Sequence, residues 1–203
     1  DNPDNIYLTA PVNGNYTYRI TGTRGTVHYL GFGAQAGGYG KTASLDTSGY
    51  LEAKDMQINA DGTFEIIASV TPQAGNWLRM VPETRLIQLR QTRMDHKKEI
   101  PAQVKIERID GPNQPRHLVP ERVDKALQGV GFFVSGTAGL FARWAEDFRK
   151  HPNTMPRFNP DVALAAGGDP NIAYYHGYFA LADDEALVVE FTPPECDFWN
   201  LQL

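Results

Sequence analysis

The sequence predicts a mainly β fold, an antiparallel, jelly-roll-like β-sandwich with one long helical excursion packed on it. Through the first 110 residues, apolar and polar residues alternate with a period of two, and Gly, Pro, Asn and Asp separate the runs as in a sandwich. Over residues 121–150 the apolar spacing changes to steps of three and four, which indicates an amphipathic helix. We expect one β-rich domain over residues 1–203, with the helical excursion at 118–152.

The strand prediction for the first half depends on short alternating runs. Asp61-Gly62 is the strongest hairpin signal, because this pair favours a tight turn with a positive φ at the glycine. We expect strands on both sides of it, at 56–59 and 63–70. The other alternating runs lie at 16–21, 26–32, 85–93 and 104–107.

The helix prediction has clear limits. Pro120 suits the first turn of a helix, and Pro152 suits a stop. Glycines in between, which include Gly136, weaken the helix and make a break there plausible. We expect the apolar face, with Trp144 and Phe148 one turn apart, to pack over the sheet. The alternative is a helix that binds a partner or a membrane surface.

Strand patterns return near the end of the chain. Residues 151–170 contain four prolines and two glycines, which favour a loop with a short helix at about 161–166. Apolar runs at 172–179, 186–191 and 198–203 predict three more strands, about nine in all. The chain begins without Met and stops inside the last run, so we expect a piece of a longer protein.

Composition excludes several classes of function. The formal net charge is −5, with 19 Lys and Arg against 24 Asp and Glu, so we expect no nucleic-acid partner. No apolar run reaches the roughly 20 residues that span a bilayer. Cys196 is the sole cysteine, which excludes an internal disulfide and slightly favours a cytoplasmic location, the localisation being otherwise open. A compact chain of 22.6 kDa should expose about 9,500 Å².

A glycine-rich segment resembles nucleotide-binding motifs without satisfying them. Gly31 to Ala36 fits G-x-G-x-x-A, but the glycines at 37, 38 and 40 oppose the helix that must follow. Gly40-Lys41-Thr42 lacks the required glycine five residues earlier, where Gln35 stands. We expect no cofactor. The segment is either a plain connection or a flap that contacts a ligand.

The histidines are the main candidates for chemistry. None of the five has the spacing of a local metal site, so we expect no metal. His28 and His176 each lie in an aromatic run, and both are candidate acid–base groups flanking one cavity. The alternative, a hydrogen-bonded histidine in or near the core, is common in proteins of this kind.

Several segments together resemble a known family. They include Tyr18 to Gly25, Asp61 to Glu65, Gly75 to Leu78 and Asp184 to Glu190, with Trp199-Asn200. The chain resembles bacterial proteins that carry a domain of unknown function numbered twelve-fourteen, and would be an internal fragment of such a protein. The resemblance implies a β-rich fold. It implies no reaction and no catalytic residue.

Three functions remain open at this point. The first is a protein that binds a small apolar or aromatic ligand, because aromatic residues are 11% of the chain. The second is a hydrolase or lyase of an apolar or phenolic substrate with a histidine base. The third is a structural or assembly module that pairs through an edge strand, as a homo-oligomer or with missing segments of a longer chain. The ligand-binding candidates are Tyr29, Phe32, Tyr39, Trp77, Tyr174 and Tyr178.

Overall fold

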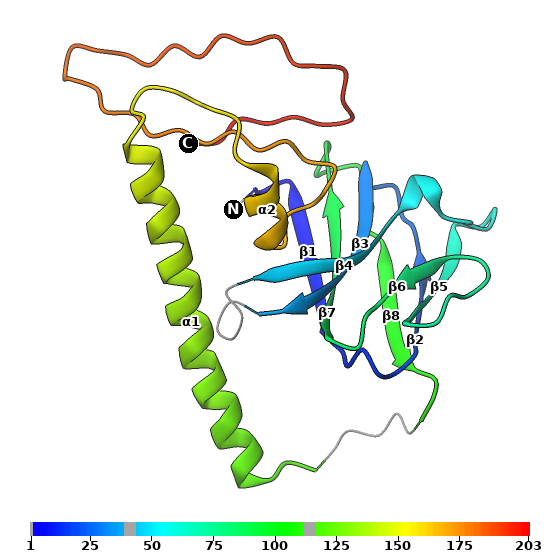
Figure 1. The fold of residues 1–203 in the computed structure, drawn as a ribbon. Helices are drawn as coiled ribbons and strands as arrows, with labels where there is room; N and C mark the ends of the chain where they lie inside the picture. Colours follow the sequence, from blue (N-terminus) through cyan, green and yellow to red (C-terminus); the bar gives the residue numbers. More distant parts are fainter. Residues whose placement is uncertain (1, 39–43, 112–116) are drawn as a thin grey trace.

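The computed structural model describes residues 2–38, 44–111 and 117–203, and it confirms the β-sandwich (Figure 1). Two four-stranded sheets lie against each other in the first half of the chain. The strands are β1 (Asn5–Pro11), β2 (Tyr18–Thr23), β3 (Tyr29–Gly37), β4 (Leu45–Glu52), β5 (Thr63–Ser69), β6 (Trp77–Arg79), β7 (Thr84–Thr92) and β8 (Gln103–Arg108). A 3-10 turn (Ala53–Asp55) and two helices, α1 (Pro120–Arg149) and α2 (Pro160–Ala165), complete the described elements.

Both sheets combine strands that are distant in sequence. One sheet has the order β1-β7-β3-β4 and the other β6-β5-β2-β8. All pairs are antiparallel except β5 with β6, which is parallel. The central strand β3 lies between β7 and β4, and its alternate residues therefore face either the core or the outer surface of the sheet.

The core lies between the two sheets. Leu30, Phe32 and Ala34 point inward from β3 and are almost fully buried. The rings of Phe32 and Phe64 meet edge to face with centroids 5.7 Å apart, which joins the two sheets directly. Burial of side chains of this size contributes about 1.5–3 kcal/mol each, so this layer is the main source of stability.

The Asp61-Gly62 turn is confirmed, but the strand expected before it is not. Gly62 has φ 82°, in the left-handed region that glycine adopts at low cost. Residues 56–59 are not a strand in the structure, because the chain leaves β4 through the 3-10 turn at Ala53–Asp55 and forms no ladder there. The backbone N–H of Asn59 donates to the carbonyl of Thr63, which closes only the turn itself.

Helix α1 forms as the sequence predicts, but it does not pack on the sheet. No side chain of its 30 residues is buried, and Figure 1 shows it standing away from the strands. Its last turns instead contact the chain that follows: the Trp144 and Phe158 ring centroids lie 4.8 Å apart. Of the two helices it is α2 that packs on β4, and the loop after α2 lies on the outer face of the same sheet.

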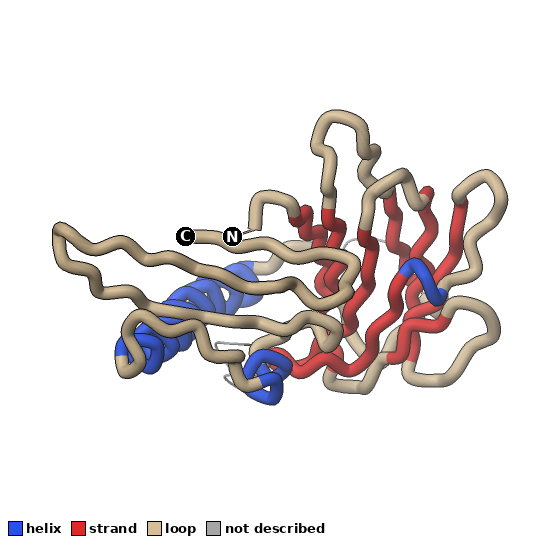
Figure 2. Tube along the Cα trace, turned by 90° about the horizontal axis from the view of Figure 1, so that it is seen from above, coloured by secondary structure: helices blue, strands red, loops and turns tan. Residues whose placement is uncertain are grey.

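The three strands expected after α2 are also not formed. We call residues 171–203 the C-terminal arm; it runs back and forth as extended chain (Figure 2) and lies at the C-terminal end of α1 (Figure 1). Isolated bridges join Tyr178 to Pro152 and Thr154, and Tyr175 to Arg157. A strand needs a partner for its backbone groups, and the sequence pattern alone does not supply one.

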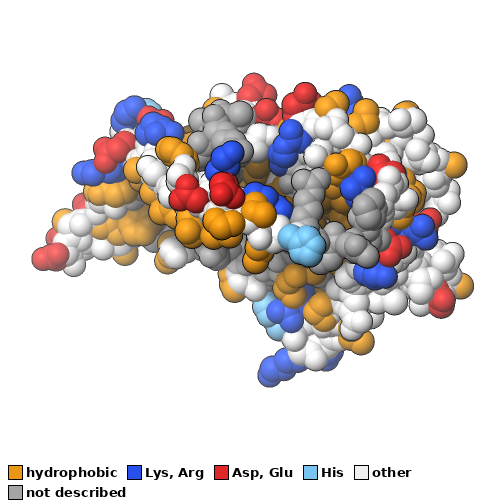
Figure 3. Space-filling model, turned by 90° about the horizontal axis from the view of Figure 1, so that it is seen from below, with side chains coloured by type: hydrophobic (Ala, Val, Ile, Leu, Met, Phe, Trp, Pro, Cys, Tyr) orange, Lys and Arg blue, Asp and Glu red, His pale blue; other side chains and the backbone are white. Residues whose placement is uncertain are grey.

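The chain as a whole is more open than its size suggests. Its accessible surface is 13514 Å², about 4,000 Å² more than a compact protein of this mass exposes. Figure 3 shows hydrophobic side chains exposed over the projecting side of the molecule, away from the sheets. Among the described residues, no helix is both long and apolar enough to cross a bilayer.

Candidate functional site

Alternation along β3 leaves a patch without side chains on the outer face of its sheet. Because Leu30, Phe32 and Ala34 face the core, the residues between them face outward. Two of these outward positions are Gly31 and Gly33, which present no side chain. The glycine pattern that resembles a nucleotide-binding motif is therefore a strand with two empty positions on one face.

The segment after α2 places a carboxylate over this patch. Gly167 has φ 78°, which ends the helix, and its N–H donates to the carbonyl of Leu164. The N–H of Gly168 donates to the carbonyl of Ala163 at 2.8 Å, in the same tight turn. The chain thus folds back onto the sheet and lays Asp169 on it, with 7% of the residue exposed.

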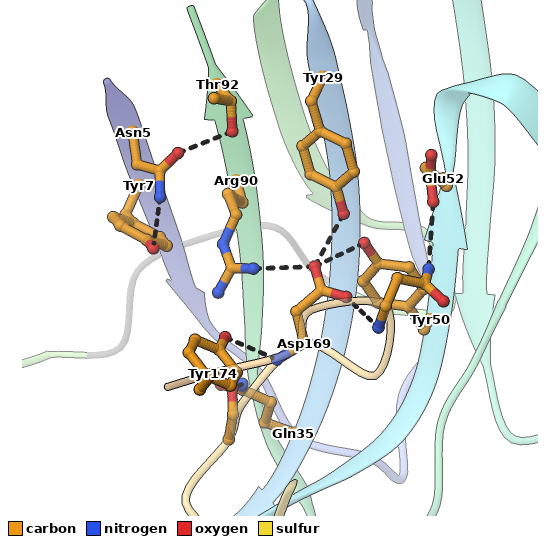
Figure 4. A network of polar contacts seen from close by, with 12 residues as sticks. Asn5, Tyr7, Tyr29, Gln35, Tyr50, Glu52, Arg90, Thr92, Asp169 and Tyr174 are labelled. Carbon is orange, nitrogen blue, oxygen red and sulfur yellow. Dashed lines mark hydrogen bonds and ion pairs between the residues drawn. The ribbon is translucent and has the colours of Figure 1, made fainter. Parts of the chain in front are cut away.

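Asp169 is the centre of a polar network (Figure 4). Its Oδ2 accepts hydrogen bonds from the hydroxyls of Tyr29 at 2.8 Å and Tyr50 at 2.9 Å, and from Nη1 of Arg90 at 2.8 Å. Its Oδ1 accepts from the backbone N–H of Asn171 at 2.9 Å. Three strands and one loop therefore meet at a single carboxylate, which fixes the start of the C-terminal arm to the sandwich.

Gly31 makes this convergence sterically possible. A Cβ at this position would lie 2.7 Å from the hydroxyl oxygens of both Tyr29 and Tyr50. Any side chain there would displace the two hydroxyls from Asp169. The requirement for glycine at position 31 thus comes from close packing over the strand rather than from its backbone conformation.

The charges of the network balance each other. Only 13% of the Arg90 side chain and 3% of the Asp169 side chain are exposed, so the ion pair is shielded from water. Burial lowers the pKa of Arg90, but Tyr7, Tyr174 and Asp169 outweigh this effect and raise it overall. Burial, followed by the charge of Asp169, raises the pKa of Tyr50. Tyr50 therefore keeps its proton and remains a hydrogen-bond donor.

A small cavity lies beside the network. It has a volume of about 20 Å³, enough for one water-sized group, and Gly33 forms part of its lining together with Gln35, Thr47, Gln88 and Arg90. The loop from Gly167 to Pro170 closes it from the other side. Within the described residues, Gln35 Oε1 and Arg90 Nε are buried and have no hydrogen-bond partner.

The structure gives the two candidate histidines separate surroundings. His28 precedes β3 and is exposed, with Nε2 2.7 Å from the carbonyl oxygen of Asp197. His176 lies among aromatic rings, with its ring centroid 4.9 Å from Phe148 of α1 and 4.8 Å from Phe158. Burial lowers the pKa of His176. Neither histidine lines the cavity beside Asp169, and a cavity shared by the two stays a prediction.

The predicted ligand-binding aromatics are also dispersed. Phe32 is in the core, and Trp77 donates from Nε1 to the carbonyl of Ser69 at 3.1 Å. Tyr178 is exposed, with the guanidinium of Arg149 over its ring at 5.7 Å. Tyr39 lies outside the described residues.

Of the predicted aromatics that the structure describes, two meet at the polar network. Tyr29 contributes its hydroxyl, and the hydroxyl of Tyr174 accepts from the backbone N–H of Asp169 at 3.4 Å. Sequence reasoning missed Asp169 itself, together with Arg90 and Tyr50. A signal for Arg90 was present, because alternation along β7 puts it on the face opposite the core residues, whereas nothing local marks Asp169.

A metal centre has no support in the part of the chain that the structure describes. His, Cys, Asp and Glu side chains do not gather there in any group of three that could hold an ion. The Asp169 carboxylate is instead occupied by four donors from the protein. The carboxylate therefore holds the loop to the sheet and is not available as a metal ligand.

Comparisons with known proteins give one close structural likeness. No family model and no curated protein matches the chain. The crystal structure of an uncharacterized protein from Burkholderia cenocepacia is 47% identical, with a TM-score of 0.87. The match covers 91% of this chain and 51% of that one, so this chain spans about half of that protein. A structure from Vibrio parahaemolyticus is 12% identical over 51% of this chain and 30% of its own, with a TM-score of 0.37.

Proposed function

We propose that this protein is an assembly module, a β-sandwich that offers α1 and the C-terminal arm as a surface for further polypeptide. The observation that carries the proposal is α1, in which no side chain is buried. Trp144 and Phe148, whose rings face the arm, lie in one stripe with apolar residues of the earlier turns. The residues of those earlier turns are not covered by any other part of the described chain. The exposed members of the stripe are Val123, Leu127, Val130, Val134 and Phe141.

The backbone of the arm points to the same role. Residues 186–191 are strongly apolar and extended, yet in the described chain no backbone–backbone hydrogen bond involves residues 186–203. Val188 is 75% exposed and Phe191 53% exposed. An extended apolar segment with free N–H and C=O groups is what an added strand pairs with.

The amount of open surface suits a permanent contact. The excess of about 4,000 Å² lies on one chain, whereas obligate interfaces of roughly 2,000–5,000 Å² count both partners and take about 1,000–2,500 Å² from each. Single exposed apolar residues are ordinary on any protein, but a contiguous helix face and strand are not. A weak or transient encounter would not require this much apolar surface.

The Burkholderia likeness supports one choice of polypeptide for this surface. The sandwich ends before residue 112, so a match to 91% of the chain at a TM-score of 0.87 includes most of α1 and the arm. The arrangement of α1 and the arm therefore recurs in a chain about twice as long as the match. We take the occupant to be the part of such a longer chain that lies outside the match.

Hydrogen exchange on the Burkholderia protein tests this proposal. The full chain and its matched half alone are compared at the positions equivalent to Ala186–Phe191 and to α1. We expect protection in the full chain and near-unprotected exchange in the half. Equal exchange in the two would contradict the proposal, as would a matched half that is monomeric and exposes no apolar surface to a dye. A defined dimer of the half with protected strands would make a second copy the occupant instead.

Three other expectations stay as proposals of lower rank. Binding of a small ligand is favoured by one observation, the cavity beside Asp169, although its lining is polar rather than aromatic. The acid–base role of His28 and His176 gains no supporting contact, since they share no ring or hydrogen-bond partner. Membership of the bacterial family that the sequence resembles is compatible with the assembly role and with the bacterial source of the Burkholderia protein.

A further inference from the structure

We propose that the open position over Gly33 is a binding site for a small neutral polyol. The site belongs to the sandwich and the loop that closes it, and it does not depend on the assembly role of α1 and the arm. A Cβ built on Gly33 meets no atom within 4 Å, so there is open space above this residue. By contrast, the equivalent space above Gly31 is filled by the two tyrosine hydroxyls.

Polar side chains surround this open space because of the strand register. Gly33 pairs with Gln88 of β7 on one side and with Tyr50 of β4 on the other. Two residues along β3, Gln35 pairs with Thr47. All of these side chains leave the sheet on the same face, and all line the cavity.

Several of these groups have unused hydrogen-bonding capacity. Gln35 is 3% exposed; its Nε2 donates to the carbonyl of Gly167 at 3.3 Å, which identifies the other amide atom as the oxygen. This Oε1 has no partner among the described residues, and neither has Nε of Arg90. A buried polar atom without a partner costs about 1–3 kcal/mol, so a ligand that satisfies it binds favourably.

The unused groups define the chemistry of the ligand. Gln35 Oε1 needs a donor and Arg90 Nε needs an acceptor, and the hydroxyls of a polyol supply both kinds of group. An anion would meet the carboxylate of Asp169, and a cation would meet the guanidinium of Arg90, so the ligand is neutral. The cavity of about 20 Å³ admits one hydroxyl, while the amide of Gln88 and the hydroxyl of Thr47 are placed at its edge for neighbouring hydroxyls.

Glycerol is the probe for this site, followed by NMR of the ¹⁵N-labelled protein. We expect saturable shifts of the Gln35 and Gln88 side-chain amides and of the Arg90 Nε–H. Gly33→Ala adds a methyl group in the open space and should weaken glycerol binding by about tenfold or more, since it displaces the hydroxyl from its partners. The matched control is Gly129→Ala on α1, where the added Cβ also meets nothing and binding should be unchanged.

The outcomes separate the alternatives. Absence of a saturable glycerol response, or equal glycerol affinity in Gly33→Ala and the unaltered protein, overturns the proposal and leaves a cavity that holds water only. Equal binding of acetate at the same amides overturns the neutral-ligand assignment. If Gly33→Ala fails to fold, Gln88→Leu provides the second test, and retention of full glycerol affinity in that variant contradicts the proposal.

Discussion

Tyr29 of β3 and Tyr50 of the neighbouring β4 donate to the same oxygen of Asp169, at 2.8 and 2.9 Å, and their hydroxyls meet over Gly31. The relationship ties the two strands to a residue more than a hundred positions later in the chain. Because Arg90 adds a third donor to that oxygen, the loop after α2 is held to three strands at once. The start of the C-terminal arm is therefore held to three strands through one carboxylate.

Removal of that carboxylate should be costly. Asp169→Ala leaves Arg90 shielded and unpaired and takes the acceptor from two hydroxyls, and loss of one partner of such a pair typically costs about 3–5 kcal/mol. We expect urea unfolding to shift accordingly, with faster proteolysis of the arm. The exposed Asp183→Ala is the control and should change stability by less than about 0.5 kcal/mol. An unchanged midpoint for Asp169→Ala would show that the network contributes nothing.

Alkaline pH should weaken the same network through Tyr50. Its pKa is raised in the folded state, chiefly by burial, above the ordinary tyrosine value of about 10. Below about pH 10 both folded and unfolded chains hold this proton; above it only the unfolded chain loses it, so stability falls as the pH rises. Tyr50→Phe should flatten this dependence between about pH 9 and about pH 11. The exposed Tyr175→Phe should leave the slope as it is.

Acid should loosen the contact between α1 and the arm through His176. Burial lowers its folded pKa below the ordinary value of about 6.5. The unfolded or detached ring therefore takes up a proton first, and stability falls as the pH drops below about 6.5 until the folded pKa is passed. NMR titration of the ring and hydrogen exchange of α1 measure both events. His176→Phe should remove the dependence; a ring pKa at or above 6.5 would contradict the burial argument.

The turn at Gly62 offers a clean test of backbone conformation. Its φ is 82° and a Cβ there meets nothing within 4 Å, so a side chain pays only the conformational cost. Gly62→Val should lose about 1–2 kcal/mol in urea unfolding. Gly62→Asn should lose less, because asparagine tolerates the left-handed region. Equal stability of the valine variant would mean that the turn relaxes to another form.

The sequence was most informative for strands that place one face in the core and the other in solvent. Alternation located β2, β5, β7 and β8 nearly to the residue, because each has one face on the core. It missed β1, β4 and β6, because β1 is mostly exposed, β4 has little buried surface, and β6 is only three residues long. The apolar runs at 186–191 and 198–203 carry strand propensity without a partner, and propensity alone cannot form a ladder.

The candidate site was harder to predict for a different reason. Tyr29 and Tyr174 were predicted as site residues because aromatic side chains commonly line ligand sites. Asp169 was not, since its significance comes from a turn at Gly167 that folds it onto strands made long before. Arg90 carried a usable signal, an outward-facing cation in the middle of a central strand, which needs a buried or nearby carboxylate.

The strand register described above also sets an order of events during synthesis. Asn5 of β1 pairs with Thr92, and Tyr18 of β2 pairs with Ala68 and Arg108, so β1 emerges from the ribosome some ninety residues before β7, and β2 some fifty residues before β5. At ~5–20 residues per second these delays are roughly 3–20 s. Until Phe64 of β5 arrives, Phe32 lacks the ring that it packs against across the sandwich. During this interval the nascent chain exposes apolar residues of its future core. We therefore expect chaperones to bind it during synthesis rather than after release.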